Sequence, residues 1–335
     1  MFKIVLRGAV IALALLPAVA AAEPIKLKLA FYTSDRASVY HSAVKPFVDA
    51  VNADGKGLVE IEVHFSGALG KSQAQQPQLV LDGVADMAFV ITGMVPDRFI
   101  DNKVIELPGL YRSLREATLT YTRLIAANAL KGYDEFFVIG AYGSEPESVH
   151  ARPPVTSLAS LNGKKIRSNN PTESGVLERL GMQAVVMPVN MTSEAISSGE
   201  IDGAAVPASM LFEFGIARVA TYHYALAISP APLALLMNRK RLDALPSPAQ
   251  DIIRKYSGKW AAARFIEARA ATENQVMAQL KSDPRRRVII PSPPDLERAD
   301  AVFKTVIDDF VRTSDHNRKL FKAATSEIAK LRGSE

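Results

Sequence analysis

Residues 25–31, IKLKLAF, alternate apolar and charged side chains, and the predicted architecture starts from this segment. A period of two is typical of a β-strand with one buried and one solvated face. A second alternating segment, VEIEVHF, occupies residues 59–65, and residues 38–52 between the two carry apolar side chains at helical spacing. The turn sequence DGKG precedes the second strand. This order of strand, helix and strand predicts the first unit of an α/β fold.

The alternation of strands and helices continues along the chain. The run DMAFVI at residues 86–91 is apolar enough to be a strand buried on both faces. Two consecutive α/β runs predict two lobes, each a mixed β-sheet flanked by helices, with a cleft between them. Further strands are expected at residues 136–142, 148–151, 164–167, 184–187, 201–205, 219–228 and 233–238, and helices at residues 73–81, 114–130, 172–180, 192–198 and 208–214.

A nearly unbroken helical pattern occupies residues 247–281. A helix of about 35 residues would be about 50 Å long at 1.5 Å per residue, so we expect it to span both lobes. The predicted division assigns residues 23–145 and about 231–275 to lobe I, residues 146–230 and about 276–320 to lobe II, and residues 321–335 to a tail helix. The chain would cross between the lobes near residues 145–147 and 228–230, which are the predicted hinges.

The first 22 residues have the features of a secretory signal peptide. Lys3 and Arg7 form a basic start, an apolar run follows at residues 9–16, and three alanines end the segment. The apolar run is short of the roughly 20 residues that span a bilayer, which argues against the alternative of a membrane anchor. We therefore expect cleavage after Ala22, before Glu23, and a periplasmic mature protein.

Composition excludes several classes of protein. Hydrophobic residues make up 48% of the 335-residue chain and charged residues 22%, which fits a globular protein and not a disordered one. The absence of cysteine excludes disulfides and thiolate sites, and the five histidines have no metal-ligand spacing. Without its leader the chain has 38 basic and 35 acidic residues, a charge of only +3, so we expect no nucleic-acid partner. We also expect no metal, no cofactor and no enzymatic activity, because nucleotide-binding and hydrolase motifs are missing.

Three segments carry a family resemblance. The first is FSGALG at residues 65–70, followed by QLVLDGVADMA at residues 78–88. The second is LASLNGKKIR at residues 158–167, and the third begins with LGM at residues 180–182 and ends with SGEIDG at residues 198–203. With ELPG at residues 106–109 between them, this order of motifs closely resembles the DctP-type solute-binding proteins of tripartite ATP-independent periplasmic (TRAP) transporters. The resemblance covers about residues 25–311.

The resemblance implies a two-lobed periplasmic receptor that captures a small organic carboxylate in its cleft. The partner it implies is a membrane transporter with a small and a large subunit, and we expect the receptor itself to be monomeric. In the family, the arginine of the second motif, here Arg167, grips the carboxylate. A guanidinium suits this role because it is planar, always charged and offers a fork of donors. The alternative for Arg167 is a structural ion pair.

Two departures from the family pattern affect the expected ligand. Related receptors often have a second arginine 20 positions before the first, where this chain has Glu147. The amide side chain that often follows the third motif is replaced by Ala204 and Ala205. Doubly charged C4-dicarboxylates are therefore less expected here than in the family at large. Glu147 could meet an ammonium or hydroxyl group on the ligand, or it could be a locally paired acid, and the sequence leaves both open.

Other candidate ligand contacts follow from topology, because ligands in open α/β folds bind beyond the carboxyl ends of strands. Residues at strand ends also serve turns, which is the alternative for each candidate. The candidates are Tyr32, Thr33, Ile91, Thr92, Asn169, Asn190, Ser209 and Phe212.

The sequence therefore predicts a periplasmic solute receptor for a TRAP-type transporter. A second hypothesis is a binding protein that serves a sensor or regulator, and a third is a periplasmic enzyme whose catalytic residues come together only in the fold.

Overall fold

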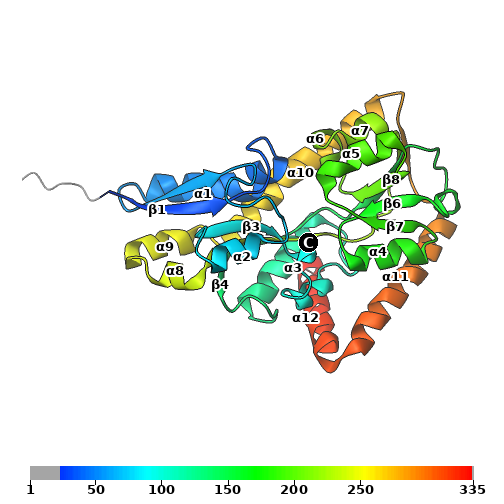
Figure 1. The fold of residues 1–335 in the computed structure, drawn as a ribbon. Helices are drawn as coiled ribbons and strands as arrows, with labels where there is room; N and C mark the ends of the chain where they lie inside the picture. Colours follow the sequence, from blue (N-terminus) through cyan, green and yellow to red (C-terminus); the bar gives the residue numbers. More distant parts are fainter. Residues whose placement is uncertain (1–22, 334–335) are drawn as a thin grey trace, which may run out of the picture.

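The computed structural model describes residues 23–333, so the predicted signal peptide lies outside the described residues. Two β-sheets form the cores of two lobes, with helices around each (Figure 1). This is the mixed α/β, two-lobed architecture that the sequence predicted. Within residues 23–333, no helix is long and apolar enough to cross a membrane.

The sheet of lobe I has five strands in the order β2-β1-β3-β10-β4. Its first three strands are parallel, and β10 runs antiparallel to both β3 and β4. Leu27 and Leu29 of β1 are buried while Lys26 and Lys28 point outward, as the alternation predicted. The strands are β1 (Ile25–Ala30), β2 (Val59–His64), β3 (Met87–Ile91), β4 (Phe136–Gly143) and β10 (Pro232–Asn238).

The sheet of lobe II has six strands in the order β11-β9-β5-β8-β6-β7. The strand β6 lies between β8 and β7 and is parallel to both, so their carboxyl ends meet at one edge of the sheet. The strands are β5 (Ser148–Ala151), β6 (Lys165–Ser168), β7 (Gln183–Val186), β8 (Gly203–Val206), β9 (Tyr222–Tyr224) and β11 (Arg287–Ile289). The long strand predicted at 219–228 is shorter, because the chain leaves the sheet after Tyr224 to cross to lobe I.

Helices cover both sheets. Lobe I carries η1 (Tyr40–Val44), α1 (Lys45–Asp54), α2 (Gln76–Leu81), η2 (Thr92–Met94), η3 (Ile100–Val104), α3 (Leu114–Ala126), α8 (Arg239–Asp243) and α9 (Ser247–Lys255). Lobe II carries η4 (Leu158–Leu161), α4 (Pro171–Arg179), α5 (Val189–Ser198), α6 (Met210–Glu213) and α7 (Ile216–Val219).

The helical segment at 247–281 is two helices rather than the one that its pattern predicted. It divides into α9 and α10 (Lys259–Ser282) at Gly258, whose φ of 60° is unfavourable for residues with a side chain. The 24 residues of α10 still correspond to about 36 Å. Phe265 of α10 lies in a lobe I core and Leu280 in a lobe II core, so α10 does span both lobes.

Two further helices tie the lobes together at the C-terminal end. Ala299 and Phe303 of α11 (Pro293–Thr313) pack into lobe II, whereas Leu320 and Ala324 of α12 (Asp315–Arg332) pack into lobe I. The two helices meet at a sharp angle (Figure 1). The terminal helix begins at Asp315, earlier than the predicted residue 321, because Ser314 caps its N-terminus by accepting a hydrogen bond from Asn317 N.

The chain crosses between the lobes in two neighbouring extended segments, residues 144–147 and 225–231. Ser144 N donates to Ala231 O at 3.0 Å, and Glu147 N donates to Ser229 O at 3.0 Å. These bonds hold the two crossings side by side. The hinge role expected for residues 145–147 and 228–230 stays a prediction.

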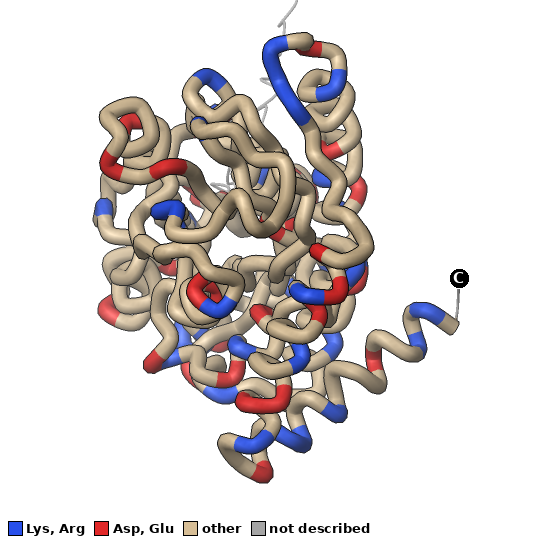
Figure 2. Tube along the Cα trace, turned by 90° about the vertical axis from the view of Figure 1, so that its right-hand side faces the viewer, with Lys and Arg blue, Asp and Glu red and all other residues tan. Residues whose placement is uncertain are grey.

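Basic and acidic residues are interspersed over the face that Figure 2 shows, without a continuous basic stripe. The arginine triplet at residues 285–287 begins in a turn where Asp283 forms ion pairs with Arg285 and Arg286.

Candidate ligand-binding site

Arg167 lies near the carboxyl end of β6, between β7 and β8, and only 5% of its surface is exposed. Two backbone carbonyls hold the guanidinium: Nε donates to Met187 O and Nη1 donates to Ala205 O, both at 3.0 Å. No carboxylate of residues 23–333 lies within 4 Å to form an ion pair with Arg167. Carbonyls fix the orientation of the guanidinium but do not neutralise it.

Two buried glutamates lie beside Arg167. Glu147 is 2% exposed and lies in the first crossing segment, and Glu173 is fully buried in the first turn of α4. Asn169 joins them, because its side-chain amide donates to Glu147 Oε1 and its backbone N–H donates to Glu173 Oε2 at 2.8 Å. Asn170 caps α4 by accepting from Glu173 N at 2.8 Å. The capping sequence therefore places Glu173 next to the carboxyl end of β6.

The environment keeps these carboxyl groups from ionising freely. Burial raises the pKa of Glu147 well above its ordinary value, and the adjacent Glu173 raises it further, while Arg167 opposes the rise. Burial also raises the pKa of Glu173. One oxygen of each group, Glu147 Oε2 and Glu173 Oε1, receives no hydrogen bond from the described residues. Two adjacent buried carboxylates cannot both be charged at low cost, so the pair is expected to hold a proton.

Lobe I contributes a third buried acid, Glu106, which follows η3. Its Oε2 accepts a hydrogen bond at 2.8 Å from Thr172 of α4, so the contact joins the two lobes. Burial raises the pKa of Glu106 to about 7, with the negative charge of Glu173 adding to the effect. Gly93 packs closely against this acid, since a Cβ at that position would lie 2.4 Å from Glu106 Oε1 and Glu106 would have to shift.

A cavity of about 310 Å³ lies between the lobes. Tyr32 and Thr33 line it from lobe I, and Asn190 lines it from lobe II. Pro188, also on its wall, directly follows the residue whose carbonyl holds Arg167. The remaining lining residues are Lys71, Ser72, Gln73, Ala74, Met94, Val189 and Phe214. A larger cavity of about 450 Å³ lies within lobe I between α3, β4 and the α9–α10 junction, and none of the predicted site residues lines it.

The other candidates have different positions. Thr92 is fully buried in lobe I, where its hydroxyl donates to Pro232 O at 3.1 Å and accepts from Asn102 Nδ2 at 2.5 Å. Ile91 packs against the lobe I core. Phe212 lies under Arg286, whose guanidinium carbon is 5.5 Å from the ring centre. Neither Thr92, Ile91 nor Phe212 lines the 310 Å³ cavity.

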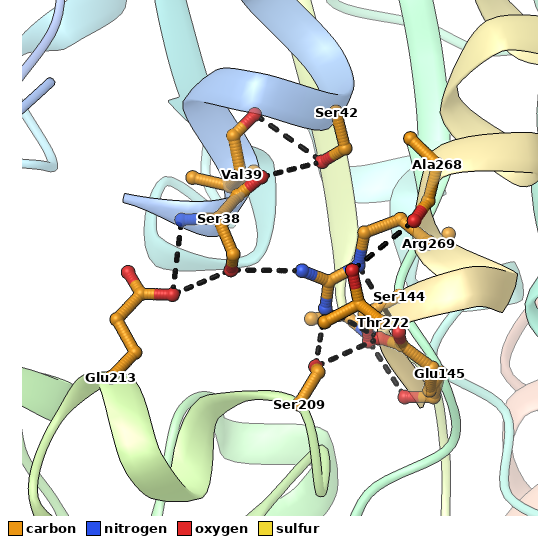
Figure 3. Close-up of polar contacts among 12 residues, drawn as sticks. Ser38, Val39, Ser42, Ser144, Glu145, Ser209, Glu213, Ala268, Arg269 and Thr272 are labelled. Carbon is orange, nitrogen blue, oxygen red and sulfur yellow. Dashed lines mark hydrogen bonds and ion pairs between the residues drawn. The ribbon is translucent and has the colours of Figure 1, made fainter. Parts of the chain in front are cut away.

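Ser209 belongs to a second polar cluster, which sequence inspection missed (Figure 3). Its centre is the ion pair between Arg269 of α10 and Glu145 of the first crossing segment, with Nε–Oε1 and Nη2–Oε2 distances of 3.1 and 2.8 Å. Arg269 Nη2 also donates to Ser209 Oγ.

This cluster reaches across the lobes. Arg269 Nη1 donates to Ser38 Oγ of lobe I at 3.0 Å, and Ser38 N donates to Glu213 Oε2 of lobe II at 3.1 Å. Figure 3 shows Arg269 between the Ser38 segment and the Ser209 segment. The sequence signal was slight: Arg269 falls within the helical pattern, and only its burial distinguishes it from a solvated arginine.

The sequence predictions thus fall into three groups. Arg167, Glu147 and Asn169 form one buried cluster at the edge of the lobe II sheet, and Tyr32, Thr33 and Asn190 line the neighbouring interlobe cavity. Ile91, Thr92, Ser209 and Phe212 lie elsewhere. Glu173 was not predicted, although the pattern of asparagine followed by glutamate three residues later is a known helix-capping signal.

The family model for bacterial extracellular solute-binding proteins, family 7 (DctP), matches residues 31–314. The chain belongs to this family. Its members are solute-binding proteins rather than enzymes, are periplasmic, and work with the membrane subunits of TRAP transporters.

Solved structures show the same fold. A marine metagenome TRAP solute-binding protein specific for aromatic acids, in complex with metahydroxyphenylacetate, matches with a TM-score of 0.83 and 24% identity over 91% of this chain and 99% of that one. A TRAP solute-binding protein from Rhodoferax ferrireducens with copurified benzoate matches with a TM-score of 0.80 and 24% identity over 92% of this chain and 99% of that one.

Sequence relatives agree with this assignment. The 2,3-diketo-L-gulonate-binding periplasmic protein YiaO of Escherichia coli is 23% identical over 299 residues, which cover 87% of this chain and 89% of that protein. With a solute-binding protein of Verminephrobacter eiseniae, the match is 22% identical over 212 residues, and the chain spans only 63% of that protein's length.

Within residues 23–333, no group of three or more histidine, cysteine or acidic side chains is positioned to hold a metal ion.

Proposed function

We propose that this protein is an exported, monomeric receptor that binds a small organic carboxylate between its lobes at Arg167 and delivers it to a TRAP membrane transporter with a small and a large subunit. The observation that carries the proposal is a buried guanidinium held by two carbonyls, with no ion pair among the described residues. A ligand carboxylate would form with this guanidinium the ion pair that no described residue forms within 4 Å.

The relatives support a carboxylate as the ligand. Metahydroxyphenylacetate, benzoate and 2,3-diketo-L-gulonate, named for three of the four relatives described above, each carry one carboxylate group. In this chain Glu147 replaces a frequent second arginine and lies beside Arg167, so a second carboxylate on the ligand would meet a carboxyl group instead of a second guanidinium. We therefore propose that monocarboxylates bind more tightly than C4-dicarboxylates.

Binding would close the lobes about the two crossing segments, residues 144–147 and 225–231. Closure removes water from the pair formed by Arg167 and the carboxylate and so strengthens the attraction. Micromolar to nanomolar affinity corresponds to about 8 to 12 kcal/mol, which is within reach of a small enclosed site.

The test is a thermal-shift screen of the mature protein. The panel contains benzoate, 3-hydroxyphenylacetate and 2,3-diketogulonate as monocarboxylates, with succinate and malate as C4-dicarboxylates. At least one monocarboxylate is expected to raise the melting temperature, because a ligand that binds only the folded state stabilises it. Titration calorimetry on each hit then gives the affinity. A protein stabilised by the dicarboxylates alone would contradict the preference, and one stabilised by no acid of a widened panel would contradict the function.

A further inference from the structure

The charge of Arg167 is balanced when the neighbouring carboxyl groups of Glu147 and Glu173 share a single proton. Arg167 contributes one positive charge, and Glu147 and Glu173 together contribute one negative charge when they hold a single proton. A carboxylate placed on Arg167 would leave this buried cluster with one excess negative charge. A buried and uncompensated charge costs several kcal/mol, so binding must bring a positive charge with it.

The geometry around the two glutamates fits a shared proton. Asn169 donates to one oxygen of each carboxyl group, to Glu147 Oε1 from its amide and to Glu173 Oε2 from its backbone N–H. The other two oxygens, Glu147 Oε2 and Glu173 Oε1, are buried and receive no hydrogen bond from the described residues. A proton between the two groups would supply the missing donor. A second proton would make the pair neutral and release Arg167 for the ligand.

We propose that Glu147 and Glu173 form a proton-accepting carboxyl pair within the ligand site, and that capture of a monocarboxylate on Arg167 is coupled to the uptake of one proton by this pair. The inference rests on the proposed function, since it takes Arg167 as the carboxylate contact. It also gives Glu147 a role that neither a second arginine nor a solvated acid would have.

The other charged groups near the pair are few. From lobe I, Glu106 lies close to Glu173, and Lys103 lowers the pKa of Glu106. In the first crossing segment, Glu145 is paired with Arg269. The second crossing segment, residues 225–231, contains no titratable side chain. The proton taken up on binding therefore goes to the pair itself, with Glu106 the nearest other acceptor.

The experiment is titration calorimetry of the mature protein with the tightest-binding monocarboxylate of the panel, near neutral pH, in phosphate, HEPES and Tris buffers. These buffers differ in ionisation enthalpy, so the observed heat reports the number of protons taken up. Wild-type protein is expected to take up close to one proton. Because one proton is linked to binding, affinity should weaken by up to about tenfold per pH unit as the pH rises above neutral.

Variants locate the proton. The double variant Glu147→Gln/Glu173→Gln imitates the neutral pair, so uptake should vanish and affinity should become independent of pH. Glu273→Gln is the matched control, because Glu273 is an acid with a raised pKa on α10, near Glu145 and away from Arg167. It should keep the wild-type proton count. If the double variant does not fold, the number of protons taken up by the wild-type protein and by the single variants Glu147→Gln and Glu173→Gln tests the proposal.

The outcomes separate the two proposals. Tight binding without proton uptake in the wild-type protein overturns the coupling and leaves the receptor function intact. Unchanged uptake in the double variant also overturns it, because the proton would then reside elsewhere. Absence of heat with every carboxylate overturns the receptor function and the coupling together.

Discussion

Arg269 and Arg167 are two arginines with nearly the same burial, 4% and 5% exposed, and opposite surroundings. Arg269 meets Glu145 through two hydrogen bonds and two serine hydroxyls besides. Arg167 meets two carbonyls and, among the described residues, no carboxylate within ion-pair distance. Arg269 is neutralised by its own acid and so serves the fold. Arg167 has no acid of the described residues within ion-pair distance, which is why we propose it as the contact for an anionic ligand.

The largest expected effect is on stability, from Arg269→Ala. This change leaves Glu145 buried without its cation, which costs about 3–5 kcal/mol. It also removes the link between Ser38 and Ser209 across the lobes. Denaturant unfolding should show this loss, and Arg264→Ala, which removes an exposed arginine paired with Glu267, should change the free energy of unfolding by less than about 1 kcal/mol. Equal losses of stability in the Arg269→Ala and Arg264→Ala variants would contradict a stabilising role for the buried ion pair.

The next effect is on binding, from Arg167→Ala. Loss of a buried, hydrogen-bonded charge partner typically costs about 2–5 kcal/mol in affinity, or roughly 30-fold to several-thousand-fold. The ligand-free protein should keep its melting temperature within a few degrees, because Arg167 forms no ion pair within 4 Å and a second proton on Glu147 and Glu173 can offset the lost positive charge. Arg167→Lys keeps the charge but not the fork, and should bind more weakly than wild type and better than the alanine variant. Calorimetry measures the affinity of each variant, and thermal unfolding measures its melting temperature. Wild-type affinity in the alanine variant would exclude Arg167 as a ligand contact.

The smallest expected effect concerns Glu106, the buried lobe I acid near Glu173. Burial raises the pKa of Glu106 in the folded protein to about 7 from an ordinary value of 4.5. The folded state therefore binds more protons than the unfolded state between these values, so the contribution of Glu106 to stability is complete below about pH 4.5 and is lost as the pH rises through 7. This loss is about 1–3 kcal/mol. Denaturant unfolding across this pH range should show a shallower decline in the Glu106→Gln variant than in the wild-type protein, and an equal decline in both would show that Glu106 is not the group responsible.

Much of the secondary structure was predictable from the sequence because the patterns that indicate it are local. Alternation in residues 25–31 and 59–65 reflects β1 and β2, strands with one more exposed face, and the continuous apolar run at residues 86–91 reflects β3, a strand buried on both faces. The position of Arg167 near a strand end and the substitution of Glu147 for an arginine were also visible in the sequence. The helix break at Gly258 was not predicted, because a single glycine in an otherwise helical pattern does not indicate a positive φ.

The sequence by itself determined the α/β order, the two lobes and the presence of one arginine suited to a carboxylate. Only the tertiary structure decided which acid meets which arginine. Glu145 and Glu147 are two residues apart, yet one neutralises Arg269 from the spanning helix and the other joins Glu173 beside Arg167. Local periodicity records which side chains are buried, but the electrostatic partner of a buried charge depends on distances across the fold, which no local pattern contains.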